Sequence, residues 1–229
     1  MEKSELKGKS FKVRRLFKQD VDLIENSFSY YDRLHFNPVT RQFILNVLLC
    51  GEFWGVFHNG KIVGATWLFK GEEEFFRTYN AKWEIEDLLN KDLKDCLICG
   101  YIWCDEEYKN QGIWQLCSRL WRMQGAKTEK KFMVHYTCAH CYCDFNSLFE
   151  NGFSLVGLRG LDNIVPHYIF TGKITFKAAP IYSTKRVERV PMEDTKQLSQ
   201  LLEQGYKGVH LDKENNFCMI REESNDDKV

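Results

Sequence analysis

The stretch from Tyr101 to Cys117 has the composition of a ligand-binding turn. A short apolar strand is followed by a charged turn, by Gly112 and by a segment with helical character. A strand that leads through glycine into a helix directs backbone N–H groups at one point, where phosphate oxygens can be held. Glycine at such a turn also arises from plain backbone geometry. The stretch predicts a nucleotide-like cofactor site, to be judged by the elements around it.

Cysteine is the second residue type that could carry chemistry. The nine cysteines are an odd number, which favours reduced thiols over a disulfide framework. The cluster Cys138–Cys143, with His135 and the pair Cys96 and Cys99, raises the question of a zinc site. On a strand, however, a spacing of three sends Cys96 and Cys99 to opposite faces, where they cannot share one ion. We expect small buried side chains there and no metal, with a zinc-binding regulatory protein as the weakest hypothesis.

The elements that must position this chemistry follow from turn signals and periodicity. Asn59-Gly60 between two β-type runs predicts an antiparallel hairpin over 53–69. The other expected elements are a strand at 11–16, a helix from Asp20, a helix over 38–49, a strand at 132–138 and a strand after Gly152-Phe153.

In this order of elements, and in its glycine turn, the chain resembles the GNAT acetyltransferase family. The acyl-CoA binding pattern of that family is Arg or Gln, two residues, Gly, one residue, and Gly or Ala. The matching positions run from Lys109 to Trp114: the first is basic, Gly112 is in place, and Trp114 replaces the last small residue. The resemblance extends from about Phe11 to about Ile174.

The resemblance implies an α/β (α+β) fold with a mixed, mostly antiparallel central sheet flanked by helices. It also implies acetyl-CoA as co-substrate, wedged where two strands splay apart and hydrogen-bonded to the strand that ends near Cys104. The cofactor-binding residues implied in this way are Trp103, Cys104, Lys109, Asn110, Gln111, Gly112, Ile113 and Trp114.

Acetyl transfer to an amine needs a base for the amine, polarisation of the thioester carbonyl and an acid for the departing thiolate. The residues leave Glu106, His135 or a water chain as the base, although a lone histidine on a strand is more often structural. The usual acid of the family is a tyrosine four residues before the Gly-Phe glycine, where Leu148 stands here. Tyr136 or Tyr142 is the substitute acid, or else water protonates the thiolate.

The acceptor is not specified by the sequence. In the family, the two N-terminal helices border its site. Residues 71–95 are longer than a simple connector, and Glu72, Glu73 and Glu74 are either a solvated charge run or acid groups for a cationic amine.

The chain divides into a GNAT-like domain, 1–175, and a small C-terminal extension, 176–229. The extension predicts a strand at 187–190, a helix from Glu193 to Gln204 and a strand ending near Ile220. About fifty residues bury little surface by themselves. We therefore expect it to pack on the main domain or on a partner subunit, which makes a homodimer plausible.

Charge and hydropathy exclude some function classes. The 32 basic and 32 acidic side chains balance, and no basic stripe suits nucleic acid. The start of the chain lacks the apolar core of a signal peptide, and no apolar run has membrane-spanning length. A cytoplasmic protein without nucleic-acid or membrane partners is expected.

Two functions remain in view. The leading hypothesis is an N-acetyltransferase that moves an acetyl group directly from acetyl-CoA to a primary amine. The alternative is a non-catalytic acyl-CoA binding or sensing protein of the same fold, because Trp114 could crowd the pyrophosphate.

Overall fold

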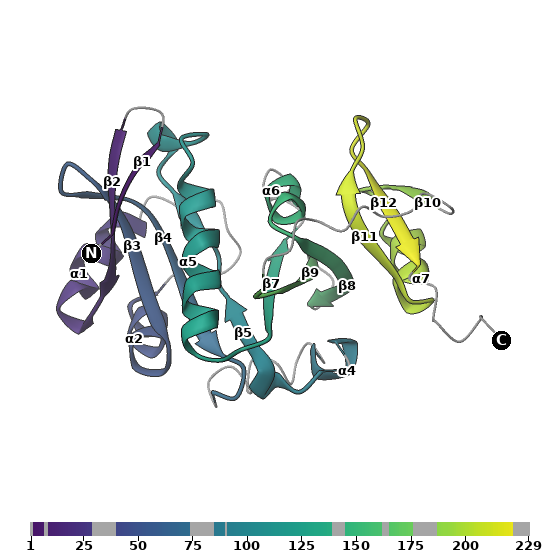
Figure 1. Cartoon of the computed structure of the whole chain (residues 1–229), viewed down its shortest axis with the longest axis horizontal. Helices are drawn as coiled ribbons and strands as arrows, with labels where there is room; N and C mark the ends of the chain where they lie inside the picture. Colours follow the sequence, from purple (N-terminus) through teal and green to yellow (C-terminus); the bar gives the residue numbers. More distant parts are fainter. Residues whose placement is uncertain are drawn as a thin grey trace.

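The computed structural model describes residues 2–6, 9–28, 40–73, 85–89, 91–138, 145–161, 165–175 and 187–221. Its centre is a 12-stranded sheet in the order β1-β2-β3-β4-β5-β7-β9-β8-β11-β12-β10, with β6 beside β4 (Figure 1). β5 and β7 run parallel, and the other described pairs are antiparallel. The predicted mixed, mostly antiparallel sheet is confirmed.

The N-terminal half builds one side of this sheet. Its elements are β1 (Glu2–Leu6), β2 (Lys9–Leu16), η1 (Lys18–Asp20), α1 (Val21–Phe28), α2 (Arg41–Cys50), β3 (Glu52–His58) and β4 (Lys61–Lys70). The hairpin predicted at Asn59-Gly60 is present, and both turn residues have the positive φ values that a tight hairpin turn requires. Asp20 accepts a hydrogen bond from the Phe17 N–H and pairs with Arg14, so it fixes the entry to α1.

The middle of the chain supplies the elements around the predicted ligand site. They are α4 (Ile85–Leu89), η3 (Leu93–Asp95), β5 (Cys96–Cys99), β6 (Trp103–Cys104), η4 (Glu106–Tyr108), α5 (Ile113–Lys127), β7 (Phe132–Cys138), α6 (Phe145–Glu150), β8 (Phe153–Leu161) and β9 (Val165–Lys173). The strands predicted at 132–138 and after Gly152 are confirmed.

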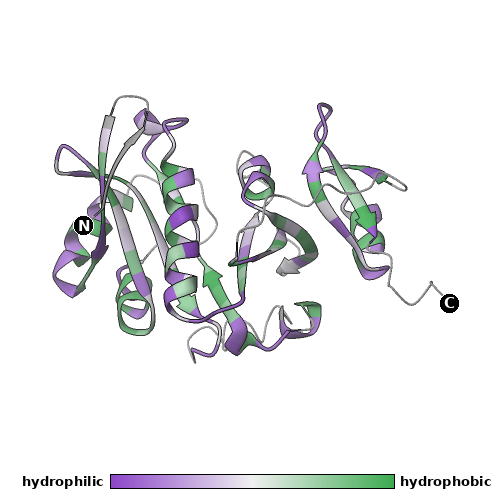
Figure 2. Cartoon of the chain, viewed as in Figure 1, coloured by the Kyte–Doolittle hydropathy of each residue, from purple (hydrophilic) through white to green (hydrophobic). Residues whose placement is uncertain are grey.

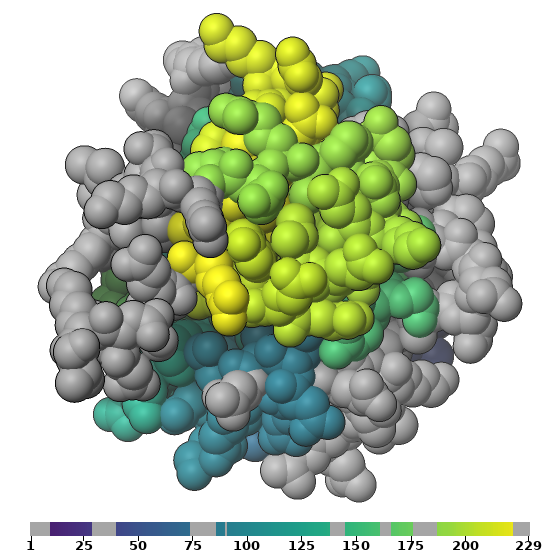
Figure 3. Space-filling model, turned by 90° about the vertical axis from the view of Figure 1, so that its right-hand side faces the viewer, coloured from purple at the N-terminus to yellow at the C-terminus, as the bar shows by residue number. Residues whose placement is uncertain are grey.

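The C-terminal segment continues the same sheet beyond β8. It comprises β10 (Val187–Pro191), α7 (Thr195–Glu203), β11 (Tyr206–Leu211) and β12 (Asn216–Arg221). The predicted single strand after Gly205 is two strands, because the Asp212 carboxylate accepts the Glu214 and Asn216 N–H groups and turns the chain. Figure 3 shows this end of the molecule, where light green and yellow atoms cover the centre of the view.

The two faces of the sheet carry different helices. α5, α6 and α7 cover one face, with a core that includes Trp121, Phe145 and Leu198. α1, α2 and α4 cover the other face, with Ile24, Ile44 and Leu89 in its core. Each helix carries both apolar and polar residues (Figure 2). A helix that packs on one side buries its apolar residues there and exposes the polar ones. We call these the α5 face and the α1 face. In the described part of the chain no helix is long and apolar enough to cross a membrane.

Candidate cofactor and acceptor site

The sheet opens into a fork at the carboxyl ends of its two parallel strands. β5 pairs with β7 from Cys96 opposite Phe132 to Cys99 opposite His135. Beyond this point β6 pairs with β4, while residues 136–138 of β7 pair with β9. The two arms of the fork are β6 and the end of β7, and these described strands do not pair with each other. A ligand between the arms would lie along these two strand edges.

A bulge separates β5 from β6. Leu68 of β4 faces Cys99, and Ala65 faces Trp103, so three steps along β4 match four steps along its neighbour. One extra residue reverses the side on which later side chains project. Simple alternation predicts Cys99 and Trp103 on one face. That prediction is wrong, because Cys99 lies in the α5-face core and Trp103 in the α1-face core.

The bulge also sets the direction of the backbone at Cys104. The Asp105 N–H donates to the Val63 carbonyl of β4 at 3.0 Å. In an extended strand, successive N–H groups point to opposite edges. The Cys104 N–H therefore points away from β4, towards the fork.

α5 begins beside this arm. Gly112 has φ +85° and forms the N-cap of the helix without a side-chain cap. Leu116 N–H returns to the Gly112 carbonyl, and the N–H groups of the first turn project from the helix end. A Cβ atom at Gly64 of β4 would lie 2.5 Å from Ile113, so glycine there lets the helix approach the sheet.

Trp114, the departure from the family pattern, is half-buried on the α5 face. Its ring makes an edge contact with Trp121 at 5.8 Å between centroids. Trp121 donates from Nε1 to Thr66 Oγ1 and stacks beside His135 at 5.2 Å. Trp114 thus extends an aromatic row that reaches the apex of the fork.

His135 sits at that apex and is 2% exposed. Its Nδ1 lies 3.0 Å from the Cys99 carbonyl oxygen, so Nδ1 carries the proton and donates. Burial lowers the pKa of His135 to about 4, against the opposing effect of the Cys99 and Gly100 carbonyls. A buried neutral imidazole with this pKa suits fixing the two strands better than accepting a proton near neutral pH.

Tyr136 and Thr137 follow on the open arm. Tyr136 is half-buried and packs on the α1-face core, whereas His135 contacts the α5 helix, as alternation along a strand requires. Thr137 is 3% exposed, and its Oγ1 has no hydrogen-bond partner among the described residues. Thr137 was not predicted from the sequence, although its spacing of two from His135 was a usable signal.

Several charged side chains of the polar turn before α5 already have ion-pair partners. Lys109 pairs with Glu106 at 2.7 Å, and both side chains are well exposed. Lys61 pairs with Asp105, whose carboxylate also accepts the Glu107 N–H. The three candidate catalytic residues are therefore dispersed: Glu106 lies in the outer turn, and His135 and Tyr136 face opposite sides of β7.

Gln111 completes the turn. Its Nε2 donates to the Glu107 carbonyl at 2.8 Å, while its buried Oε1 has no hydrogen-bond partner in the described part of the chain. Asn110, beside it, has a positive φ of 60°. The turn thus presents one unsatisfied amide oxygen next to the start of α5.

Most of the described thiols are buried, whereas Cys50 and Cys104 are half-buried. Cys96 and Cys99 lie in the two different cores, which confirms that they face opposite sides. Burial raises the pKa of Cys96 to about 11 and raises the pKa of Cys99 well above the usual value of a thiol. The described residues contain no group of three or more side chains able to hold a metal ion. Cys141, Tyr142 and Cys143 lie outside the described residues.

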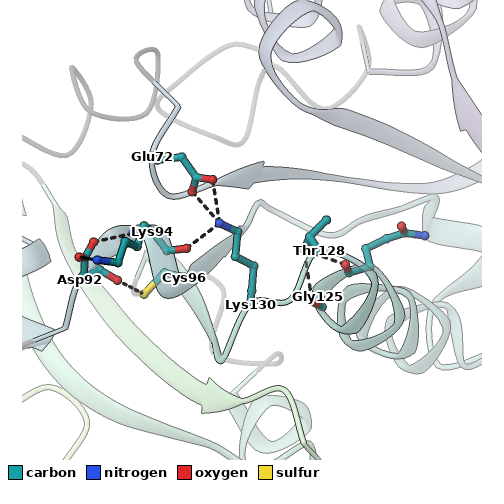
Figure 4. Close-up of polar contacts among 8 residues, drawn as sticks. Glu72, Asp92, Lys94, Cys96, Gly125, Thr128 and Lys130 are labelled. Carbon is teal, nitrogen blue, oxygen red and sulfur yellow. Dashed lines mark hydrogen bonds and ion pairs between the residues drawn. The ribbon is translucent and has the colours of Figure 1, made fainter.

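Glu72, a candidate for binding a cationic amine, has a different partner. Both of its carboxylate oxygens accept from Lys130 Nζ, which is 8% exposed in its side chain and also donates to the Lys94 carbonyl (Figure 4). Burial tends to raise the pKa of Glu72, but the Lys130 bond and charge lower it overall. Glu72 therefore forms an ion pair at the end of the β5–β7 ladder opposite the fork. Glu74 lies outside the described residues.

α6 offers no proton donor at the position where the family has its acid. Leu148 and Phe149 are buried in the α5-face core. The helix instead fixes the next turn, where Asn151 accepts from Ser118 Oγ of α5 at 3.0 Å. Any catalytic acid at the fork would have to come from another element.

Several solved structures with a similar fold are acetyltransferases. The ribosomal-protein-S18-alanine N-acetyltransferase of Escherichia coli aligns with 76% of this chain and 99% of its own at a TM-score of 0.51 and 14% identity. The yncA protein of Salmonella typhimurium, solved with its cofactor acetyl-CoA, aligns with 76% and 99% at a TM-score of 0.53 and 11% identity.

A GNAT-family acetyltransferase of Staphylococcus aureus Mu50 aligns with 72% of this chain and 99% of its own, at a TM-score of 0.53 and 14% identity. No protein-family model and no curated protein matches the sequence. The chain has the fold of the GNAT acetyltransferases, as its glycine turn and element order predicted. Identities this low establish the fold, and function is argued from the site.

Proposed function

We propose that the chain is an N-acetyltransferase that moves an acetyl group directly from acetyl-CoA to the primary amine of a small acceptor. The fork carries this proposal. Its arms separate after Cys99 and His135, and the glycine-capped start of α5 lies against the β4 side of the opening. An amine is proposed to reach a thioester between the arms from the α1 face, because that face carries the two N-terminal helices, which border the acceptor site in the resembled family.

Acetyl-CoA fits the polar groups that the fork offers. The N–H groups at the start of α5, with the helix dipole, suit the pyrophosphate. Thr137 Oγ1 on the open arm is buried without a partner among the described residues, and a ligand amide between the arms would satisfy it. Gln111 Oε1, beside the α5 start, is a second acceptor that no described residue satisfies. Both orphan atoms support a polar ligand at this place.

Acetyl-CoA supplies the activated carbonyl carbon and a thiolate leaving group. The Cys104 N–H, which points into the fork, is proposed to donate to the carbonyl oxygen as negative charge develops there. The new C–N bond forms as the C–S bond breaks, and the amine proton leaves through ordered water. His135 holds the apex and so positions both arms.

Tyr136 is the proposed acid. It is half-buried on the α1 face of the open arm, and its phenol can give a proton to the departing sulfur and recover one from water. Glu106 is retained only as a residue of the outer turn, because its carboxylate is paired with Lys109. Lys109 and Asn110 are proposed to border the phosphates.

Thermal stability with and without acetyl-CoA tests the site. Binding to the native state raises the melting temperature by mass action. Gly112→Glu should abolish the rise, because bulk and negative charge block the start of α5. Gly205→Glu is a matched control, since Gly205 has φ +84° and no atom within 4 Å of the place that a Cβ would take. The Gly205→Glu variant introduces the same backbone strain and charge away from the fork. It should keep the rise in melting temperature with acetyl-CoA.

ADP-ribose is the ligand control for this test, because it shares the diphosphate but lacks the thioester arm. No rise in the wild type with acetyl-CoA, or equal loss in both glycine variants, would remove the cofactor site. A rise with acetyl-CoA alone that Gly112→Glu cancels is the expected result.

The alternative, an acyl-CoA binding protein without turnover, rests on α6 and Trp114. Leu148 and Phe149 leave α6 without a proton donor, and Trp114 adds bulk beside the helix start. Release of free thiol from acetyl-CoA in the presence of a panel of amines separates the two functions. Binding without amine-dependent thiol release would favour the sensor.

A further inference from the structure

Three neighbouring strands bring polar residues together on the α1 face beside the fork. Cys138 of β7 is opposite His167 of β9, which is opposite Arg159 of β8. Two residues earlier, Tyr136 is opposite Ile169, which is opposite Gly157. Residues paired across a sheet project from the same face, and so do residues two apart.

The face of this row is fixed by its buried members. Ile169 belongs to the α1-face core, and a Cβ atom at Gly157 would lie 2.2 Å from Leu88 of α4. His167 and Arg159 therefore project on the same side as Tyr136, towards the side from which the acceptor is proposed to enter. Tyr168, the residue after His167 on β9, projects to the opposite face, and its hydroxyl donates to the Met192 carbonyl.

Arg159 has an unusual environment for a guanidinium. Its Nε is buried without a hydrogen-bond partner in the described part of the chain, and Nη1 donates to the Leu158 carbonyl at 3.1 Å. No carboxylate of the described residues forms an ion pair with it. A half-buried guanidinium loses part of its hydration. An anion bound to its N–H groups would offset that cost.

We propose that Arg159, with His167 beside it, binds a carboxylate of the acceptor, which makes the acceptor a small amino acid or a short peptide rather than a simple amine. This inference rests on the proposed function. Arginine presents paired N–H donors that match the two oxygens of a carboxylate. Tyr136 would then lie at the amine end and Arg159 at the acid end of one acceptor.

The spacing limits the size of that acceptor. β8 lies two strands from β7, which is about 10 Å across the sheet. An extended chain covers about 3.5 Å per residue. The side chains of Arg159 and Tyr136 shorten the distance that the acceptor itself must cover. A single amino acid or a peptide of two or three residues then spans the gap.

Binding of product analogues tests the subsite without requiring turnover. The probes are N-acetylglycine, N-acetyl-β-alanine, N-acetyl-γ-aminobutyrate and N-acetyl-dialanine, each beside its C-terminal amide, with affinity measured by calorimetry. In the wild type, at least one carboxylate should bind about 10-fold or more tightly than its amide. Arg159→Gln should reduce that preference to about 2-fold or less.

Arg189→Gln is the matched control. Arg189 is an exposed residue of the outer strand β10, at 3.6 Å from Asp212, and its loss removes the same charge far from the fork. It should keep the full preference. Arg159→Lys retains the charge without the paired donors and should lose part of the preference; it serves if Arg159→Gln does not fold, as circular dichroism would report.

Each outcome decides between the two proposals. Equal binding of every carboxylate and its amide in the wild type would overturn the subsite, and so would a preference that survives Arg159→Gln. Neither result touches the acetyl-CoA-dependent thermal shift, which tests the proposed function separately. A carboxylate preference that depends on Arg159 without any acetyl-CoA effect would leave the subsite standing and remove the transferase.

Discussion

The two ends of the paired strands β5 and β7 differ in how their polar groups are satisfied. At the closed end, Lys130 is surrounded by the Glu72 carboxylate and the Lys94 carbonyl, and Lys131 joins Asp95. At the fork, the ladder stops at Cys99 and His135, and Thr137 keeps a hydroxyl that no described residue satisfies. One end satisfies its polar groups internally, and the other keeps a buried hydroxyl without a described partner, as the proposed ligand site would require. Ligand sites often carry this cost in stability.

The largest expected effect concerns pH and the fork apex. The pKa of His135 is lowered to about 4 in the folded chain, so the unfolded chain binds a proton more readily. This contribution to stability is present above about pH 6.5 and is lost as pH falls towards 4. It amounts to about 3 kcal/mol by the usual conversion of pKa into free energy.

Urea unfolding at pH 7 and at pH 4.5 measures this effect. His135→Gln removes the titrating group, so the variant should lose less stability on acidification than the wild type. Equal losses would show that the imidazole is not buried neutral. If His135 were the catalytic base, the variant would lose about 100-fold or more in kcat at neutral pH, and we expect less than about 10-fold.

At the closed end, Lys130→Ala should lower the free energy of unfolding by about 2 kcal/mol. The change leaves Glu72 without its partner, and the partial exposure of Glu72 keeps the loss below that of a fully buried pair. Lys131→Ala is the matched control. Its pair with Asp95 is more exposed and should contribute less than about 1 kcal/mol.

Acetyl-CoA binding provides the second readout for that pair of variants. Neither substitution should change the ligand-dependent rise in melting temperature, because both lie at the end away from the fork. Loss of the rise in Lys130→Ala alone would mean that the two ends are coupled.

The glycine before α5 gives a smaller effect. Gly112→Ala should cost about 1 kcal/mol, because a side chain disfavours φ +85°. Gly205→Ala, at φ +84°, should cost about the same. Urea titrations of both variants check the shared cost, and only Gly112→Ala should also weaken acetyl-CoA binding. Equal acetyl-CoA affinities would place the ligand elsewhere.

The smallest effect on stability is expected for Thr137→Val. The Thr137 hydroxyl has no described partner, so its removal should change the free energy of unfolding by less than about 1 kcal/mol in either direction. Acetyl-CoA should nevertheless bind about 3- to 10-fold less tightly. Thr66→Val is the contrast, because Thr66 accepts from Trp121, and calorimetry should find lower stability there.

Several elements could be predicted from the sequence because their signals are local. Asn59-Gly60 specifies its turn through backbone conformations that few other residues adopt. Gly112 marks the start of α5 in the same way. The turn at Asp212 was missed, although an aspartate that binds N–H groups two and four residues on is a recognisable signal.

The candidate site was predictable only in outline. The turn from Lys109 to Trp114 and the neighbouring strand were identified, but the exposure of Glu106 and the burial of His135 were not. Burial depends on which elements pack over a residue, and a strand pattern of alternating residues does not contain that information.

The sequence by itself determined the order of elements, the glycine turn before α5 and the opposite facing of Cys96 and Cys99, because each depends on neighbours in the chain. Tertiary structure decided the rest. Pairing of β6 with β4 created the bulge that turns Trp103 to the α1 face, and the end of the β5–β7 ladder opened the fork. Three-strand register aligned Arg159 and His167 with the arm that carries Tyr136. These features depend on contacts between residues distant in the chain, and only the folded sheet fixes which strands meet and where they part.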